Sequence, residues 1–137
     1  MVFTFAHAIE RPMKVLVVED REIDRLILKT ELEPHFDVFF GRTSQEALGL
    51  ALNQHFDVAL INVMLQEDME AATLLPKLQH LAEYPFIAIA LTSHLDEPRI
   101  RTLMATGFQH ILYKPFDKKV FEQVLFRLTS ARFMQAS

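Results

Sequence analysis

The chain has 137 residues, half of them apolar, with no cysteine and a formal net charge of −4. This length fits one compact domain, and the apolar content argues against disorder. The acidic balance argues against direct nucleic-acid binding, which needs a basic face, and the lack of cysteine excludes disulfides and thiolate metal sites.

The first twelve residues precede the first predicted strand. Ala6-His7-Ala8 is similar to a signal-peptide cleavage site, but no basic residue precedes it and the apolar run before it is too short. No segment reaches the ~18 apolar residues of a membrane span, so we expect a cytoplasmic protein. We predict an N-terminal extension over residues 1–12, in which Phe3 and Phe5 could anchor an ordered arm, with a loosely held terminus as the alternative.

Short apolar runs alternate with segments of helical period along the rest of the chain, which predicts strand–helix pairs and a parallel sheet. We predict one domain over residues 13–131, followed by a C-terminal tail over 132–137. The predicted strands are about 14–18, 36–40, 58–61, 86–91 and 108–112.

The first predicted helix covers about residues 21–32 and ends before Pro34. The second opens at Thr43, where Glu46 three residues later completes a capping box. The inner face of the first helix is expected to hold Ile23, Ile27, Leu28 and Leu32. The inner face of the second is expected to hold Ala47, Leu48, Ala51 and Leu52.

Pro76 decides where the third helix is predicted to start. A proline costs ~3 kcal/mol in a helix interior but is tolerated in the first turn. We therefore expect Thr73 to cap this helix and residues 66–72 to form a loop. Its inner face is expected to hold Leu74, Leu75, Leu78 and Leu81.

The last two helices carry clear start signals. Asp96 is predicted to cap the fourth, with Pro98 in its first turn and Gly107 at its end. The fifth is predicted to start after Pro115, with Asp117 as its cap. Ile100, Leu103 and Met104 should face inward in the fourth helix. The apolar stripe of the fifth is formed by Val120, Phe121, Val124, Leu125 and Leu128.

Polar residues follow four of the predicted strands: the pair Glu19 and Asp20, then Asn62, Thr92 and Lys114. Ligands of open parallel sheets bind at the carboxyl ends of strands, near the point where strand order reverses. The pattern predicts that these side chains share one pocket. Taken singly, each has a plainer interpretation, such as an acidic pair that caps the first helix.

Together these segments resemble the receiver domain of two-component response regulators over nearly the whole chain. The matching runs are Val15-Leu16-Val17-Val18-Glu19-Asp20, Val58-Ala59-Leu60-Ile61-Asn62, Leu91-Thr92-Ser93 and Tyr113-Lys114-Pro115. The resemblance implies a doubly wound, flavodoxin-like α/β fold with a five-stranded parallel sheet of order 2-1-3-4-5 and five helices.

The resemblance also implies a role for each pocket residue. Glu19, Asp20 and the backbone carbonyl of Met64 match the ligands of Mg²⁺, and Asn62 stands at the position of the phosphoacceptor aspartate. Thr92 matches the hydroxyl that contacts the phosphoryl group. Lys114, followed by a cis Pro115, matches the cation that pairs with the acceptor.

Several departures from the family pattern concern this chemistry. The Asn62 amide has no charge and cannot take a phosphoryl group. Residues 65–70 lack the usual proline and glycine, and Ile111 replaces an aromatic residue, while Tyr113 is expected to point to the other face. We therefore predict a pseudo-receiver that is not an enzyme, binds no cofactor and binds Mg²⁺ weakly or not at all, with Lys114 turned toward Asp20 or Glu19.

Such a module would act by phosphorylation-independent protein–protein interaction. Its expected partner is a signalling protein, either a histidine kinase or a downstream effector. The predicted interaction face is built from the fourth helix, the fifth strand and the fifth helix, and the same face could support a homodimer. The residues expected to be exposed on it are Arg99, Arg101, Gln109, Tyr113, Lys118 and Lys119.

Other interpretations remain open from the sequence. The main alternative is a competent phospho-accepting receiver whose acceptor aspartate has been changed to Asn62. Asp68 could be a replacement phosphosite, and His94 could reach the pocket. An unrelated flavodoxin-like enzyme would need a glycine-rich loop, which the three glycines of the chain do not provide.

Overall fold

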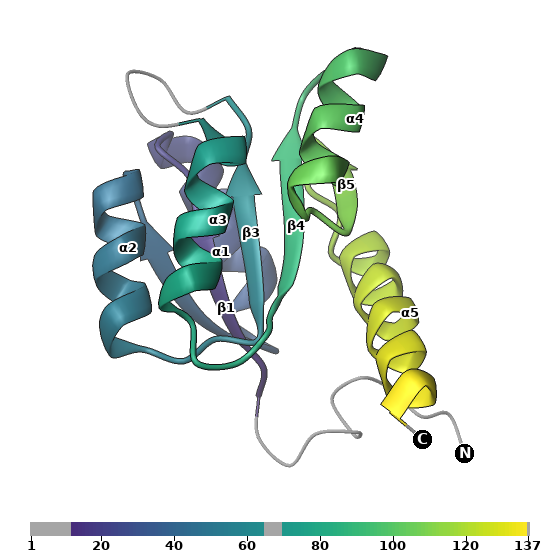
Figure 1. Ribbon diagram of the computed structural model, residues 1–137. Helices are drawn as coiled ribbons and strands as arrows, with labels where there is room; N and C mark the ends of the chain where they lie inside the picture. The colour runs from purple at the N-terminus through teal and green to yellow at the C-terminus, as the bar shows by residue number, and fades with distance from the viewer. Residues whose placement is uncertain (1–11, 65–69, 137) are drawn as a thin grey trace.

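The computed structural model describes residues 12–64 and 70–136, with side chains described up to Ser130. Its five strands all pair in parallel, in the order β2-β1-β3-β4-β5, which confirms the predicted fold class (Figure 1). The strands are β1 (Lys14–Val18), β2 (Asp37–Gly41), β3 (Val58–Asn62), β4 (Ile87–Thr92) and β5 (His110–Tyr113).

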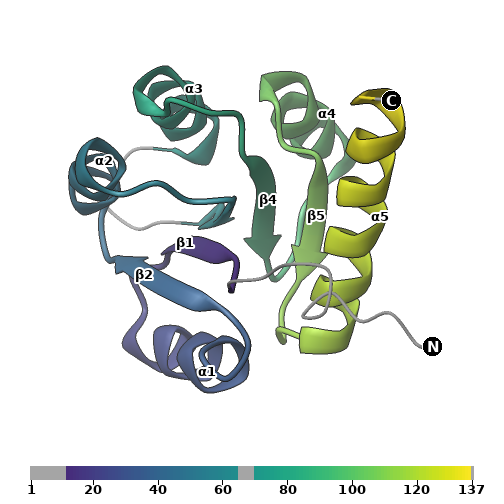
Figure 2. The same cartoon turned by 90° about the horizontal axis from the view of Figure 1, so that it is seen from below.

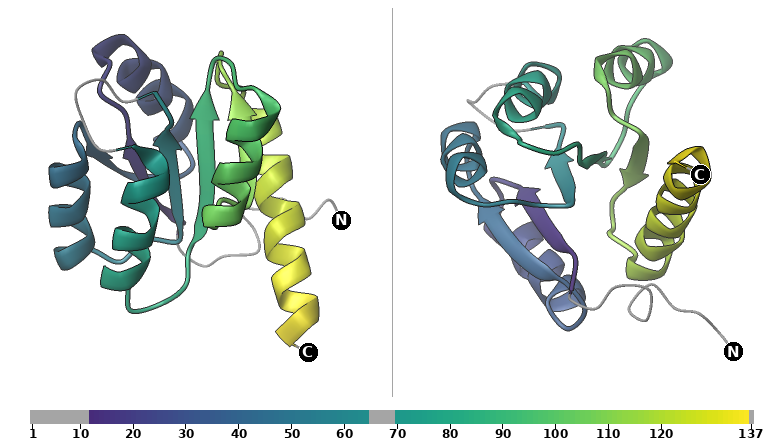
Figure 3. Two further views of the ribbon diagram at one scale, coloured as in Figure 1. Left: turned by 45° about the horizontal axis from the view of Figure 1, so that its top comes forward. Right: turned by 60° about the horizontal axis from the view of Figure 1, so that its bottom comes forward.

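A helix follows each strand, as the alternating pattern predicts. The helices are α1 (Glu22–Leu32), α2 (Ser44–Asn53), α3 (Ala71–Leu81), α4 (Glu97–Thr106) and α5 (Lys118–Ala136). Helices α2, α3 and α4 cover one face of the sheet, and α1 and α5 cover the other (Figures 2 and 3). Helix α5 includes residues 132–136, which the sequence pattern assigns to a tail. None of the helices in the described part of the chain is long and apolar enough to cross a membrane.

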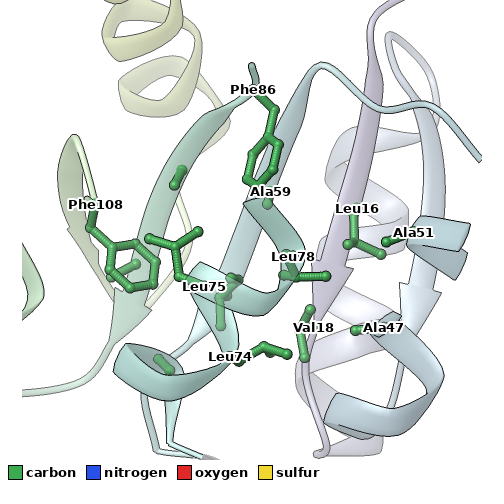
Figure 4. Close-up of a cluster of buried hydrophobic side chains, with 14 of the residues drawn as sticks. Leu16, Val18, Ala47, Ala51, Ala59, Leu74, Leu75, Leu78, Phe86 and Phe108 are labelled. Carbon is green, nitrogen blue, oxygen red and sulfur yellow. The ribbon is translucent and has the colours of Figure 1, made fainter. Parts of the chain in front are cut away.

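Each face of the sheet buries its own apolar cluster. Because side chains alternate along a strand, Leu16 and Val18 of β1 face α2 and α3, whereas Val15 and Val17 face α1 and α5. The first cluster includes Leu74, Leu75 and Leu78 of α3 together with Phe86 and Phe108 (Figure 4). Burial on both faces explains why the central strands are continuous apolar runs.

Three of the four predicted helix caps are present, and Thr73 is the exception because it lies inside α3. The Thr43 side chain accepts a hydrogen bond from the backbone N–H of Glu46 at 3.1 Å, and Asp96 accepts one from Arg99 at 2.9 Å. Asp117 accepts one from the backbone N–H of Lys119 at 2.9 Å, just before α5. These bonds satisfy donors that a helix leaves unpaired at its N-terminus.

The predicted start of α3 is wrong. The helix begins at Ala71, with Glu70 as its N-cap residue, so Pro76 lies inside the helix rather than in its first turn. The side chains of Ala71, Leu74 and Leu75 are fully buried against the sheet. Their burial offsets the ~3 kcal/mol that an interior proline costs, and the first turn therefore forms ahead of the proline.

The predicted apolar stripes are too wide at their edges. Ile23 of α1 is 63% exposed and Leu52 of α2 is 68% exposed, although both were expected to face inward. The same correction applies to Ile27, Met104 and Val120. A helix that lies on one side of a sheet buries a narrow arc, and these residues lie outside it.

Candidate functional site

The polar residues predicted to share a pocket all lie at the carboxyl edge of the sheet. Glu19 directly follows β1 and Lys114 follows β5, while Asn62 and Thr92 are the last residues of β3 and β4. These four strands are neighbours in the sheet, and their parallel pairing brings their ends to one edge. Glu19, Asn62 and Thr92 are buried from solvent.

Asn62 is held at both ends of its amide group. Its Nδ2 donates a hydrogen bond to Glu19 Oε1 at 2.8 Å, and its Oδ1 accepts one from the backbone N–H of Met64 at 3.1 Å. Only 2% of Asn62 is exposed. Two carboxylates could not approach each other this closely without a proton or a cation between them. The short contact with Glu19 therefore depends on the amide N–H₂ group of Asn62.

Lys114 places its ammonium between two acids. Its Nζ lies 3.1 Å from Glu19 Oε2 and 2.9 Å from Asp24 Oδ2. Glu19 is one of the two partners predicted from the sequence, whereas Asp24 was not foreseen. The peptide bond between Lys114 and Pro115 is cis, as the resemblance implied.

Glu19 is the centre of this network. Burial raises the pKa of its carboxyl group above the ordinary value, against the lowering effects of the Arg21 backbone N–H and Lys114. The Arg21 N–H donates to Oε1 at 3.2 Å, and Arg25 donates to the backbone carbonyl of Glu19 at 3.0 Å. A fully buried carboxylate is tolerated here because donors surround it.

Asp24 is the member of the site that the sequence analysis missed. It lies four residues before the buried Leu28 on α1, so it belongs to the inner side of this helix, and its side chain is 20% exposed. An acid within an otherwise apolar inner stripe is the signal that would have identified it.

Asp20, the other member of the predicted acidic pair, follows Glu19 and is half-buried. The remaining residues predicted at or near the pocket have separate environments. Thr92 is buried, and its hydroxyl donates to the backbone carbonyl of His94 at 3.2 Å. The His94 side chain is exposed and lines an open groove of about 740 Å³ together with Arg21, Met64 and Arg99. Asp68 lies outside the described residues.

The donors around Glu19 do not suit a divalent cation. Magnesium prefers oxygen ligands, but one Glu19 oxygen faces the Asn62 N–H₂ group and the other faces the Lys114 ammonium. Among residues 12–64 and 70–136, no three His, Asp or Glu side chains gather as a metal site. The Lys114 ammonium supplies positive charge at this point.

The predicted interaction face is only partly exposed. Tyr113 is 50% exposed and Lys119 is also exposed, whereas Lys118 is half-buried. Arg99 and Arg101 form ion pairs with Glu70 and Glu97, at 3.5 and 3.7 Å.

Gln109 and Tyr113 need correction within that face. Gln109 precedes β5 at the opposite edge of the sheet and is half-buried, and its Oε1 accepts from the Ala88 N–H at 3.1 Å. Ile111 packs against the cluster under α4. Because β5 pairs regularly with β4, Tyr113 lies on the same side of the strand as Ile111, so the expected opposite orientation is wrong.

Comparisons with known proteins agree with this architecture. The family model described as the response regulator receiver domain matches residues 15–126. A receiver domain protein from Methanospirillum hungatei JF-1 is 22% identical, with a TM-score of 0.78, covering 90% of this chain and 99% of that chain. The signal receiver domain of an HD domain-containing protein from Pseudomonas fluorescens Pf-5 is 26% identical, with a TM-score of 0.73, covering 92% and 98%.

A third similar structure is the chemotaxis response regulator CheY4 of Vibrio cholerae. It is 23% identical, with a TM-score of 0.73, and the match covers 85% of this chain and 98% of that chain. A search of the curated proteins gave no match.

Proposed function

Because the chain belongs to the response regulator receiver domain family of two-component signalling, we propose that it is a pseudo-receiver that acts through phosphorylation-independent binding of another protein. Receiver domains are generally signalling modules rather than enzymes. In this proposal Asn62 occupies the phosphoacceptor position and is not phosphorylated.

The observation that carries the proposal is the hydrogen bond from Asn62 Nδ2 to Glu19 Oε1 at 2.8 Å. Phosphoryl transfer needs an anionic nucleophile in line with the leaving group, and cations that spread the developing charge. An amide offers no such nucleophile, and its N–H₂ group points at the carboxylate that would help to hold a metal. Magnesium binding is accordingly expected to be weak or absent.

The electrostatic balance of the site supports the same function. Lys114 Nζ contacts Glu19 at 3.1 Å and Asp24 at 2.9 Å, so the acids at this edge have a cation from within the chain. A pocket whose acids are partly neutralised from within the chain has less need of a divalent ion to hold its shape. The surface of the domain could then bind a partner in the same conformation with or without a phosphodonor.

The proposed partner is a histidine kinase or a downstream effector, bound through the face formed by α4, β5 and α5. Tyr113 and Lys119 are its most suitable anchors, because both are exposed. An exposed aromatic ring beside cations suits an acidic partner surface with an apolar centre. A homodimer through the same face is the second mode of association that we propose to test.

The competing function is a competent receiver in which an acceptor aspartate has been changed to Asn62. A phosphodonor assay on the unaltered chain tests the proposal, with acetyl phosphate and Mg²⁺ as reagents and intact mass as the readout. We expect no gain of a phosphoryl group. Stoichiometric labelling of the unaltered chain would contradict the pseudo-receiver.

Affinity capture tests the binding role. The unaltered chain is expected to retain its partner in a lysate of the source organism without any phosphodonor, and Lys119→Glu combined with Tyr113→Ala should lose it. Lys77→Glu, an exposed site on α3, is the matched control and should retain the partner. Loss of capture by the control alone, or a requirement for phosphodonor, would overturn the proposed binding mode.

A further inference from the structure

We propose that Asp24 is a positioning residue that holds Lys114 away from the acceptor position, so that an aspartate at position 62 is not enough to restore efficient phosphoryl transfer. This inference rests on the proposed function, because it describes a second obstacle to phosphoryl transfer at position 62, in addition to the amide of Asn62. It assigns a role to a residue of α1 that lies outside the strand ends.

The geometry that carries the inference is the contact between Lys114 Nζ and Asp24 Oδ2 at 2.9 Å. The two residues are 90 positions apart in the sequence, and only the packing of α1 beside the β5–α5 turn brings them together. Each side chain is 20% exposed, so water screens the pair only partly. A charge-assisted hydrogen bond in such surroundings is stronger than one at an open surface.

The surroundings of the pair are mainly apolar. Asp24 and Lys114 line a cavity of about 310 Å³ whose other walls come from α1, β4 and the β5–α5 turn. The residues that form those walls are Ile27, Leu28, Leu91, Pro115 and Phe116. Apolar walls leave the Lys114 ammonium few other partners, so its position is set by Asp24 and Glu19.

A lysine whose ammonium is shared between two acids is less free to assist an acceptor. Phosphoryl transfer from acetyl phosphate forms an O–P bond at the aspartate oxygen and breaks the P–O bond to acetate, which leaves as the anion. A cation beside the acceptor stabilises the charge that spreads over the phosphoryl oxygens. Asp24 competes for the ammonium that would serve this purpose.

A plainer role for the pair is to fasten α1 to the β5–α5 turn. Under that role, removing Asp24 lowers stability but leaves the rate of phosphoryl transfer to an aspartate at position 62 unchanged. The two roles are therefore separable by a chemical readout.

The experiment compares Asn62→Asp, Asn62→Asp with Asp24→Asn, and Asn62→Asp with Glu22→Gln, all treated with acetyl phosphate and Mg²⁺. Glu22 is the matched control, an exposed acid in the first turn of α1. We expect the variant that lacks Asp24 to gain its phosphoryl group about tenfold faster than the other two, as transition-state charge stabilisation of this kind allows. Equal rates for all three variants, or no labelling of any, would overturn the role of Asp24.

A second measurement follows Lys114 directly and needs neither the metal nor phosphoryl transfer. Acylation of lysines by an amine-reactive acetyl ester, read by peptide mass spectrometry, is expected to modify Lys114 several-fold faster in Asp24→Asn than in Glu22→Gln or the unaltered chain. The exposed Lys119 should react equally in all three. An unchanged rate at Lys114 would show that Asp24 does not hold the ammonium.

The two proposals fail in different ways. Labelling of the unaltered chain would overturn the pseudo-receiver function. If Asn62→Asp is labelled as fast as Asn62→Asp with Asp24→Asn, only the positioning role of Asp24 is overturned.

Discussion

The two edges of the sheet use polar side chains differently. At the amino edge, Asp57 Oδ2 accepts a hydrogen bond from the Lys14 backbone N–H at 2.8 Å, and Gln109 Oε1 accepts one from the Ala88 N–H at 3.1 Å. At the carboxyl edge, Glu19 instead contacts the side chain of Asn62 at 2.8 Å and that of Lys114 at 3.1 Å.

The two kinds of contact differ in how much stability is lost when a side chain is removed. A side chain that bonds to a strand backbone completes the sheet, and its removal costs about one hydrogen bond. A side chain that bonds to another buried charge depends on that partner, and removal of either leaves an uncompensated group in a low-dielectric site. The carboxyl edge is therefore where small changes should have large effects.

The largest expected effect is that of Lys114→Ala. This change removes the ammonium from between Glu19 and Asp24 and leaves a buried carboxylate without its ion pair. We expect the free energy of unfolding to fall by about 3 kcal/mol, measured by urea unfolding at pH 7. Lys119→Ala, an exposed control on α5, should change it by less than about 0.5 kcal/mol. If Lys114→Ala and Lys119→Ala lower the free energy of unfolding equally, the ion pairs of Lys114 do not stabilise the fold.

A pH series with Glu19→Gln tests the buried carboxyl group itself. Burial raises the pKa of Glu19, so the folded chain holds this proton more tightly than the unfolded chain. The stability linked to this proton is fully present below the ordinary pKa and is lost as the pH rises through the folded value. The stability of the unaltered chain minus that of Glu19→Gln should thus fall as the pH rises above 4.5, in urea unfolding at several pH values. A flat or rising difference would contradict the raised pKa.

Asp57→Ala addresses the opposite edge. The carboxylate accepts the Lys14 N–H at the start of β1, where β1 lies between β2 and β3. We expect a loss of about 1.5 kcal/mol in the free energy of unfolding, because one charge-assisted hydrogen bond is removed and water can reach the site. Asp37→Ala, an exposed acid of β2, is the control. A loss as large as that of Lys114→Ala would remove the contrast between the edges.

The smallest expected effect is that of Gln109→Ala. Its neutral hydrogen bond to the Ala88 N–H at 3.1 Å joins β5 to the start of β4. The expected loss is about 1 kcal/mol, measured by thermal or urea unfolding. Gln123→Ala on the exposed side of α5 should be nearly neutral, since alanine is also a strong helix former. A binding defect without a stability change would instead return Gln109 to the interaction face.

Much of this architecture could be predicted from local patterns. The strands are apolar runs that end in polar residues, and the caps at Thr43, Asp96 and Asp117 need only neighbouring backbone N–H groups. The meeting of Asn62 with Glu19 follows from parallel pairing of β1 with β3. Such features depend on periodicity and strand order, which the residues themselves express.

The wrong predictions concern features that depend on contacts between distant parts of the chain. Helix α3 begins ahead of Pro76 because burial of Ala71, Leu74 and Leu75 against the sheet stabilises its first turn. Helix propensities do not include this contribution from tertiary packing. Ile23 and Leu52 are exposed because the sheet covers a narrower arc than their spacing indicates. In each case the neighbour that decides the outcome comes from a distant part of the chain.

The residue types alone determined that this protein has an amide, and not a carboxylate, at the end of β3, because no packing converts one into the other. Only the tertiary structure decided that Asp24 also holds Lys114, since Asp24 reaches the ammonium through the docking of α1 beside the β5–α5 turn. Charge partners are chosen by distance in space, and separations of 90 residues in sequence leave that distance unspecified until the fold forms.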